Sequence, residues 1–234
     1  MPQQPQPRTN VYVDGFNFYY GSVKGTPFKW LDDRALARAL LRGHQINSVK
    51  YFTARVQDRA DDRGLAKRQD HYIRALIAHA GVEIHNGQFT RRRRCWPLAD
   101  KLKRNIVELV YVMQTEEKGS DVSLGAHLVW DACHDDMDVA LVLSNDSDLQ
   151  TLLDMVQNLG IRVVTVNPHQ QVDQPRRLLS GDKRTLSRRL LGRSQPPNLA
   201  MASNGDRISR RRMVLDAQKP AEAGHAGPST CEGI

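Results

Sequence analysis

The chain has no long hydrophobic run, and this absence excludes a class of protein. No stretch of about 18 apolar residues, roughly what a bilayer-crossing helix needs, occurs in the 234-residue sequence. The first ten residues, MPQQPQPRTN, also lack the apolar centre of a secretory signal. We therefore expect a cytoplasmic protein with no membrane partner.

Cysteine is also scarce. Cys95, Cys133 and Cys231 are odd in number and form no CxxC pair. They indicate neither a disulfide framework nor a zinc cluster. Positive charge, in contrast, is in excess: the formal net charge is +8 at pH 7. Most of this excess lies before Arg193, and it favours a polyanionic partner for the folded part.

Apolar strand-like stretches alternate with amphipathic ones along most of the chain. Five are rich in β-branched or aromatic residues, as strands are: VYVDG (11–15), INSVKYFTARV (46–56), VEIHNGQF (82–89), DVALVLS (138–144) and IRVVTVN (161–167). Helical spacing follows in LDDRALARALLRG (31–43), residues 63–80, DVSLGAHLVWDACHD (121–135) and DLQTLLDMVQNLG (148–160). This alternation predicts an α/β fold with a mainly parallel central sheet.

The pattern also predicts element boundaries and buried faces. Asp32 or Asp33 is the expected N-cap of the first long helix. Helix 63–80 should bury a face that includes Ile77, and helix 121–135 a stripe from Val122 to Cys133. We predict a flexible leader at residues 1–9, one domain over 10–193, and a disordered Pro/Ser/Gly-rich basic tail over 194–234.

The segment after the third strand is dominated by arginine. Residues 91–105 begin RRRRCWPLADKLKRN and are predicted to form a charged excursion, after which IVELVYVMQ (106–114) pairs back as a strand. Arg91, Arg92, Arg93 and Arg94 lie beside aromatic residues, a mixture suited to binding single-stranded nucleic acid. The alternative is a solvated charged loop.

Three acids recur at one topological place. Asp14 ends the first strand, Asp146 follows DVALVLS, and Asp121 opens the helix that leads into that strand. If the two strands are neighbours, the three carboxylates converge at the carboxyl edge of the sheet, where ligands bind in α/β folds. Two carboxylates about 4 Å apart repel by roughly 4 kcal/mol at an effective dielectric constant of 20, so a cation must neutralise them or protons must bind. Oxygen ligands of this kind suit Mg²⁺ or Mn²⁺.

Neighbouring polar residues extend this candidate site, each with a structural alternative. Asp148 either faces the same cleft or caps the next helix. Asn17 either orients a phosphate or a ligating aspartate, or caps a short helix. Lys118 either binds a phosphate oxygen or is merely solvated. Asp131 lies about 15 Å along the helix from Asp121, which favours a structural role.

The acids themselves also have a structural alternative, because acidic residues often end strands and cap helices. Asp14, Asp121 and Asp146 could each do so independently. Composition and spacing leave both possibilities open.

Three motifs in this order resemble one family. VYVDGFNFYYG, TEEKGSDVSLGAHLVWDA and DVALVLSNDSDLQTLL are similar to those of NYN domains, the LabA-like branch of the PIN-like nucleases. The resemblance extends from about Asn10 to about Arg193. It implies a PIN-like Rossmannoid three-layer sandwich and a metal-dependent ribonuclease site containing Asp14, Asp121, Asp146 and Asp148, with Asn17 in the DGxN pattern. Many relatives have Asn where this chain has Ser123, which puts a substrate contact there in doubt.

The combined hypothesis is a metal-dependent endoribonuclease. Asp14, Asp121 and Asp146 would be the metal ligands, with Asp148 as a fourth ligand or a water-orienting group. The resemblance implies RNA as substrate and products with 5′-phosphate and 3′-hydroxyl ends. An RNA- or nucleotide-binding regulatory module without cleavage is the alternative. A phosphatase with Asp14 as nucleophile is disfavoured because position 16 is Phe where such enzymes usually have a second Asp. A homodimer is plausible in either case.

Overall fold

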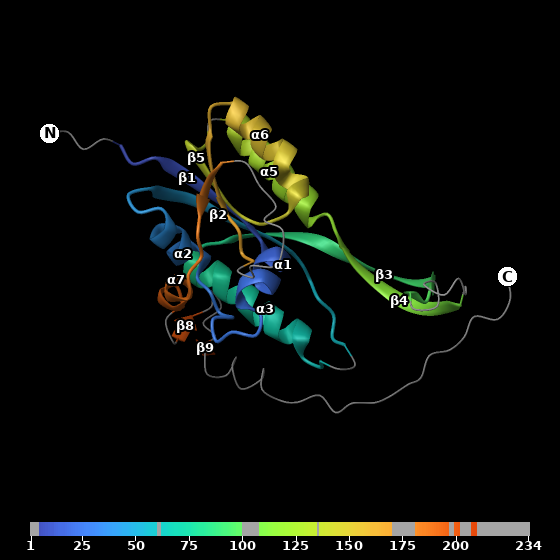
Figure 1. Ribbon diagram of the computed structural model, residues 1–234. Helices are drawn as coiled ribbons and strands as arrows, with labels where there is room; N and C mark the ends of the chain where they lie inside the picture. The colour runs from blue at the N-terminus through green and yellow to red at the C-terminus, as the bar shows by residue number, and fades with distance from the viewer. Residues whose placement is uncertain are drawn as a thin grey trace.

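A seven-stranded sheet forms the centre of the computed structural model (Figure 1). The structure describes residues 5–59, 62–99, 108–134, 136–169 and 181–196, and the backbone of 199–201 and 207–209. The strand order is β4-β3-β2-β1-β5-β6-β7. The strands are β1 Arg8–Asp14, β2 Gln45–Ala54, β3 Glu83–Pro97, β4 Leu109–Lys118, β5 Val139–Leu143, β6 Arg162–Val166 and β7 Asp182–Arg184. Every neighbouring pair is parallel except β3 and β4, so the predicted mainly parallel sheet is confirmed.

Helices cover both faces of this sheet. One face packs against α1 Gly15–Phe18, η1 Tyr19–Val23, α2 Asp33–Leu40, η2 Leu76–Ala80 and α7 Arg188–Arg193. The other face packs against α5 Ser120–Cys133 and α6 Gln150–Asn158 (Figure 1). α3 Leu65–Ala75 precedes η2, and η3 Ser147–Leu149 precedes α6. No described helix combines the length and apolar character that crossing a bilayer requires.

Side-chain alternation divides the core into two halves. In β1, Val11 and Val13 point to the α2 side, whereas Tyr12 points to the α5 side. β5 repeats this, with Leu141 on the α2 side and Val142 on the α5 side. These strands are continuously apolar because both of their faces are buried.

Local boundaries agree with the sequence, but two buried faces were predicted wrongly. Asp32 is the N-cap of α2, since its Oδ1 accepts the Ala35 N–H at 2.8 Å. In α5 the helix buries Leu124 and Leu128, while Val122 is 77% exposed. The reason is that two layers cover α5: the sheet lies on one side and Leu152 of α6 packs closely over Gly125. Ile77 is likewise exposed, because η2 continues α3 as a π-helix and the tighter α-helical spacing no longer applies.

The arginine-rich segment differs from its prediction as an excursion. β3 continues without interruption through Arg91–Arg94 to Pro97 and pairs antiparallel with β4 over ten residues. We call this two-stranded ribbon, Gln88–Pro97 with Leu109–Lys118, the arm; it projects away from the body (Figure 1). The predicted pairing back of the following strand is confirmed from Leu109 onward, whereas residues 100–105 of the proposed excursion and 106–107 of the predicted strand lie outside the described residues.

Of the predicted tail, the structure describes residues 194–196 and two short strands. β8 Leu199–Met201 pairs antiparallel with β9 Arg207–Ser209. The rest of the proposed tail after Gln195 and Pro196, and residues 1–4 of the proposed leader, lie outside the described residues.

Candidate active site

The carboxyl ends of β1 and β5 form the floor of the candidate site. The two strands are parallel neighbours, which meets the condition for the acids to converge, with Val13 opposite Leu143. Asp14 and Ser144 each follow those residues by one position, so alternation directs both toward the α5 side of the sheet. The Ser144 hydroxyl donates to Asp14 Oδ2 at 2.9 Å. The two strand ends are therefore joined through side chains as well as through the sheet.

Two further hydrogen bonds fix the Asp14 carboxylate and the Ser144 hydroxyl beside it. The Asn17 N–H donates to Asp14 Oδ1 at 3.0 Å, so Asp14 is the N-cap of α1. The Asp146 N–H donates to Ser144 Oγ at 3.1 Å. Ser144 thus contacts one acid through its hydroxyl hydrogen and the backbone of the other through its oxygen.

Asn17 connects the same two strand ends on a second path. Its Oδ1 accepts the N–H of Asn145 at 3.1 Å. The side chain therefore orients the backbone next to Asp146. The cap of α1 is provided by Asp14, not by Asn17.

Gly15 permits the sharp turn after Asp14. A Cβ at this position would lie 2.6 Å from Cε1 of Tyr51 and 2.8 Å from the carbonyl oxygen of Phe52. Only glycine therefore fits between the end of β1 and the neighbouring strand. Packing therefore requires the glycine of the DGxN motif, in addition to any chemical role of the motif.

The first turn of α5 provides the third acid, Asp121. The backbone turns at Gly119, whose φ is 95°, and the helix begins at Ser120. Glu117 Oε1 accepts the Ser120 N–H at 3.2 Å, which ties the end of β4 to the start of the helix. Asp121 lies in the first turn of the helix, half-buried beside the other acids.

The acids interact strongly with one another. Burial and the negative charges of Asp14, Asp146, Glu117 and Asp148 raise the pKa of Asp121 to about 6. Burial also raises the pKa of Asp14, against the opposing hydrogen bonds from Asn17 and Ser144 and with the charges of Asp146 and Glu117 adding to it. Structure and electrostatics therefore bring Asp14, Asp121, Asp146 and Asp148 into one field of negative charge.

Asp146 and Asp148 share one turn. Asp146 Oδ1 accepts the Asp148 N–H at 3.0 Å, which makes Asp146 the N-cap of η3. Asp148 is exposed, and its charge acts on Asp121. The capping function thus belongs to Asp146, and the Asp148 carboxylate faces solvent near the cluster.

The donor set suits a hard divalent cation, because it consists of carboxylates, and a positive charge would stabilise as anions Asp14 and Asp121, whose pKa values are raised. Within the described ranges, however, no group of three or more His, Cys, Asp or Glu side chains is spaced to hold a metal ion. An ion held by Asp14, Asp121 and Asp146 would have to draw these side chains closer together.

Other predicted site residues lie elsewhere around the cluster. Lys118 projects from the face of β4 opposite Glu117, with its Nζ 3.3 Å from Glu116 Oε2. Ser123 is about 200° around α5 from Asp121 at 3.6 residues per turn. Arg91, Arg92, Arg93 and Arg94 are all exposed on the arm. The structure brings neither Lys118 nor Ser123 into contact with the acids.

Neither Ser144 nor Glu117 was among the site residues predicted from the sequence. Ser144 is fully buried and hydrogen-bonded to the site, and Glu117 contributes to the field on Asp14 and Asp121. A polar residue directly after a continuously apolar strand was the available signal for Ser144. Glu117 had no such signal, because its importance depends on where β4 ends.

Asp131 has the structural role that its distance from Asp121 predicted. Lys50 Nζ lies 2.8 and 2.6 Å from its two carboxylate oxygens. The Tyr12 hydroxyl donates to Asp131 Oδ2 at 2.6 Å and Asn10 Nδ2 donates to the same oxygen at 3.2 Å. This buried network fastens α5 to β1 and β2.

An α/β domain with acids gathered at the carboxyl edge of a parallel sheet has a nuclease-type arrangement. The chain belongs to the NYN domain family, whose profile matches residues 8–180. This family is of nuclease type, as the resemblance of the three motifs indicated.

A curated relative and a solved structure are also similar. The relative is 6-hydroxy-3-succinoylpyridine 3-monooxygenase HspA of Pseudomonas putida (strain DSM 28022 / S16), 28% identical over 186 residues, with 69% of this chain covered. The match spans 59% of that protein's length. The structure is that of a protein of unknown function from Vibrio parahaemolyticus RIMD 2210633, with a TM-score of 0.46 and 17% identity, covering 71% of this chain and 84% of that one.

Proposed function

We propose that the chain is a metal-dependent endoribonuclease of the PIN-like Rossmannoid type, which uses Mg²⁺ or Mn²⁺ to hydrolyse RNA. The observation that supports this most is the burial of Asp121 beside the charges of Asp14 and Asp146, which together raise the pKa of Asp121 to about 6. Carboxylates are concentrated in this way where a cation offsets their repulsion. The family supplies the connection to nuclease chemistry.

Asp14, Asp121 and Asp146 are the proposed metal ligands. A bound divalent cation would supply an activated water and neutralise charge on the phosphoryl oxygens. Ser144 and the Asn17 N–H orient the Asp14 carboxylate, and Asp146 is held at the turn that also positions Asp148. Asp148, exposed beside the cluster, orients the attacking water or provides a fourth ligand.

RNA contacts would surround these acids. Asn17 lies within the site itself, bonded to the backbone beside Asp146. Lys118 of β4, Ser123 of α5 and arginines from the run Arg91 to Arg94 of β3 are the proposed outer contacts. Arginine and lysine there would offset phosphate charge near the acids.

The deciding experiment is cleavage of a labelled mixed-sequence RNA with Mn²⁺, Mg²⁺ or EDTA. Wild-type protein should cut only with metal, and Asp146→Asn should reduce the rate at least a hundredfold, a loss of about 2.7 kcal/mol of transition-state stabilisation. Asp136→Asn is the matched control, since it removes an exposed carboxylate beyond the far end of α5. Equal rates in both variants, or cutting in EDTA, would remove the acid cluster from the reaction.

Binding of RNA or a nucleotide without cleavage is the second candidate. It is favoured by the lack, in the described ranges, of three side chains spaced to ligate a metal. Under this alternative the wild type binds RNA but leaves it intact in either metal. Isothermal titration with Mn²⁺ separates the two, because a binding module need not take up the ion.

The name of the Pseudomonas relative suggests a further chemistry, monooxygenation of 6-hydroxy-3-succinoylpyridine. This activity is tested by incubating the protein with 6-hydroxy-3-succinoylpyridine, oxygen and a reduced electron donor. Consumption of the pyridine together with intact RNA would favour this chemistry over the nuclease.

A further inference from the structure

The arm has two chemically different faces. Its ten residue pairs extend it over about 30 Å at roughly 3.4 Å per residue. Strand alternation places Phe89, Arg91 and Arg93 on one face, and Thr90, Arg92 and Arg94 on the other. The four consecutive arginines are therefore two pairs that point in opposite directions.

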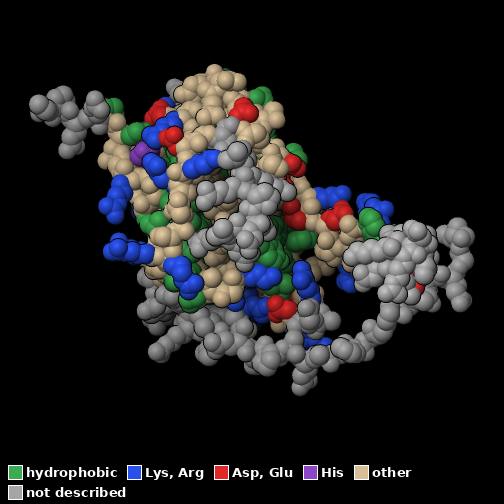
Figure 2. Space-filling model, viewed as in Figure 1, with side chains coloured by type: hydrophobic (Ala, Val, Ile, Leu, Met, Phe, Trp, Pro, Cys, Tyr) green, Lys and Arg blue, Asp and Glu red, His purple; other side chains and the backbone are tan. Residues whose placement is uncertain are grey.

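The face with Arg91 and Arg93 is continuous with the acid site. At its root, Phe89 packs edge-on against Phe16, with ring centroids 5.5 Å apart. Its cross-strand partner on the same face is Glu117, whose charge raises the pKa of both Asp14 and Asp121. Figure 2 shows acidic side chains where the arm meets the body and Lys or Arg side chains beside them.

The same face offers both charge and stacking surface. The Arg93 guanidinium lies over the Tyr111 ring, 3.6 Å from its centroid. Tyr111 and Met113 of β4 are exposed on this face, opposite Cys95 and Arg93. Exposed aromatic rings with adjacent guanidinium groups stack bases and pair with phosphates in single strands.

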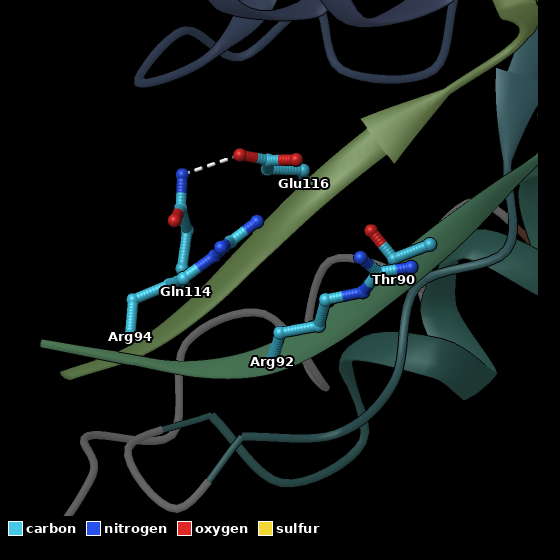
Figure 3. Close-up of a pocket in the computed structure, with 5 residues that line it drawn as sticks. All are labelled: Thr90, Arg92, Arg94, Gln114 and Glu116. Carbon is cyan, nitrogen blue, oxygen red and sulfur yellow. Dashed lines mark hydrogen bonds between the residues drawn. The ribbon is translucent and has the colours of Figure 1, made fainter.

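The opposite face is partly neutralised by its own side chains. Thr90, Arg92, Arg94, Gln114 and Glu116 line a shallow pocket there and lie on one side of the ribbon (Figure 3). Gln114 Nε2 donates to the Glu116 carboxylate, and Lys118 lies 3.3 Å from that carboxylate. This face also carries Trp96, which is exposed, so what separates it from the first face is that Phe89 and Glu117, the arm residues next to the acid site, belong to the first face.

We propose that the Phe89–Arg91–Arg93–Tyr111 face of the arm binds single-stranded RNA that continues out of the acid site, and that the Arg92–Arg94 face does not. Phe89 and Cys95 are about 20 Å apart along the strand, so the bound RNA extends well beyond the scissile bond. A duplex conceals the faces of its bases and cannot stack on Tyr111. This inference rests on the proposed nuclease function only for where the RNA is cut. Binding of single-stranded RNA to this face does not require that the RNA is cut.

Two double variants, one for each face, remove the same number of positive charges and test whether the faces differ in RNA binding. Arg91→Ala/Arg93→Ala and Arg92→Ala/Arg94→Ala each remove two exposed arginines from one strand. Fluorescence anisotropy with a labelled single-stranded RNA of about 15 nucleotides measures affinity against salt in EDTA. The titration is repeated in Mg²⁺ with Asp146→Asn present in every protein, so that no RNA is cut and metal-assisted binding is also detected.

The first pair should weaken binding at least tenfold and reduce the slope of log K against log salt by about 1.4, or roughly 0.7 per lost phosphate contact. The second pair should remain within about threefold of wild type with an unchanged slope. Tyr111→Leu, which keeps an apolar side chain, should lower affinity about tenfold without changing the slope, because it removes stacking but no charge. Circular dichroism on each variant confirms the fold.

Equal losses from both pairs, a larger loss from the second pair, or no RNA binding in either buffer would overturn the proposal. Equal affinity for a duplex of the same sequence would overturn its single-strand part. The nuclease proposal fails separately. If the pairs differ in binding but wild-type protein never cuts RNA with metal, the arm assignment stands and the nuclease proposal fails. If wild-type protein cuts RNA but the two pairs do not differ in binding, the nuclease proposal stands and the arm assignment fails.

Discussion

At the scale of single residues, Ser144 is the most informative side chain in the site. It is fully buried and hydrogen-bonds both to the Asp14 carboxylate and to the Asp146 backbone. Such partners fix the orientation of a ligand without touching the ion. Ser144 is therefore a positioning residue in the proposed nuclease.

Replacing Ser144 by Ala should reduce metal-dependent RNA cleavage by about tenfold to a hundredfold and raise the Mn²⁺ concentration needed for half-maximal rate. The free energy of unfolding should fall by only about 1 kcal/mol, since one net hydrogen bond is lost. Cleavage rates over a Mn²⁺ series and urea unfolding measure the two effects. A variant with the wild-type Mn²⁺ midpoint and rate would contradict the positioning role.

A second residue, Asp33, makes the free energy of unfolding depend on pH. It is fully buried at the start of α2, and neither carboxylate oxygen has a hydrogen-bond partner in the described part of the chain. Burial, with the charge of Asp32 adding to it, raises the pKa of Asp33 to about 8. The folded protein therefore holds this proton up to about pH 8, whereas the unfolded chain releases it near pH 4.

The free energy of unfolding should consequently decrease as pH rises from about 4 to about 8, by a few kcal/mol from this group alone. Asp33→Asn keeps the shape without the charge and should remove that component. We expect the variant to be more stable than wild type at pH 8 and similar at pH 4. Urea unfolding at several pH values tests this; an identical pH slope in both proteins would show that Asp33 does not titrate in this range.

At the scale of elements, the position of α5 depends on one buried ion pair. Asp131 of α5 binds Lys50 of β2 and accepts hydrogen bonds from Tyr12 and Asn10 of β1. The opposite end of the same helix presents Asp121 to the site. A rigid attachment at one end thus helps to orient the acid at the other.

Asp131→Asn should destabilise the protein by about 3–5 kcal/mol, because the Lys50 charge stays buried without its partner. The double variant Lys50→Met/Asp131→Leu should recover much of this loss, since neither buried charge remains. Thermal and urea unfolding of both proteins measure the difference. A double variant no more stable than Asp131→Asn would show that the loss comes from packing and not from the unpaired charge.

At the scale of the whole molecule, the arm and the body are stabilised by separate sets of contacts. Both cores are built from residues outside the arm; the described arm residues contribute no member to either. The arm is held mainly by its own strand pairing and by contacts at its root. The fold of the body should therefore not depend on the outer arm.

Replacing residues 91–115 by Asn-Gly would join Thr90 to its cross-strand partner Glu116 through a tight hairpin turn. We expect the shortened protein to unfold cooperatively within a few degrees of wild type, because none of the described residues of that segment belongs to either core. Differential scanning calorimetry measures this. A fall of more than about 10 °C would mean that the arm stabilises the body.

Much of this organisation could be predicted because it is local. The alternation of apolar strands and amphipathic helices follows from side-chain period, and it correctly predicted the mainly parallel sheet; the return of β4 was predicted as well. The N-cap at Asp32 followed from side-chain chemistry. The motifs around Asp14, Asp121 and Asp146 indicated the family and the place where the acids meet.

Other features depended on which elements pack together. The buried face of α5 was missed because both the sheet and α6 cover it, and period alone does not say from how many sides a helix is covered. The sequence by itself determined most of the strands, the longer helices and the acids that end them, because hydrophobic period and capping act over a few residues. Tertiary structure alone decided that Ser144 joins Asp14 to Asp146, that Asp131 meets Lys50, and that four consecutive arginines divide between two faces of an arm, because each outcome depends on pairing between segments distant in the chain.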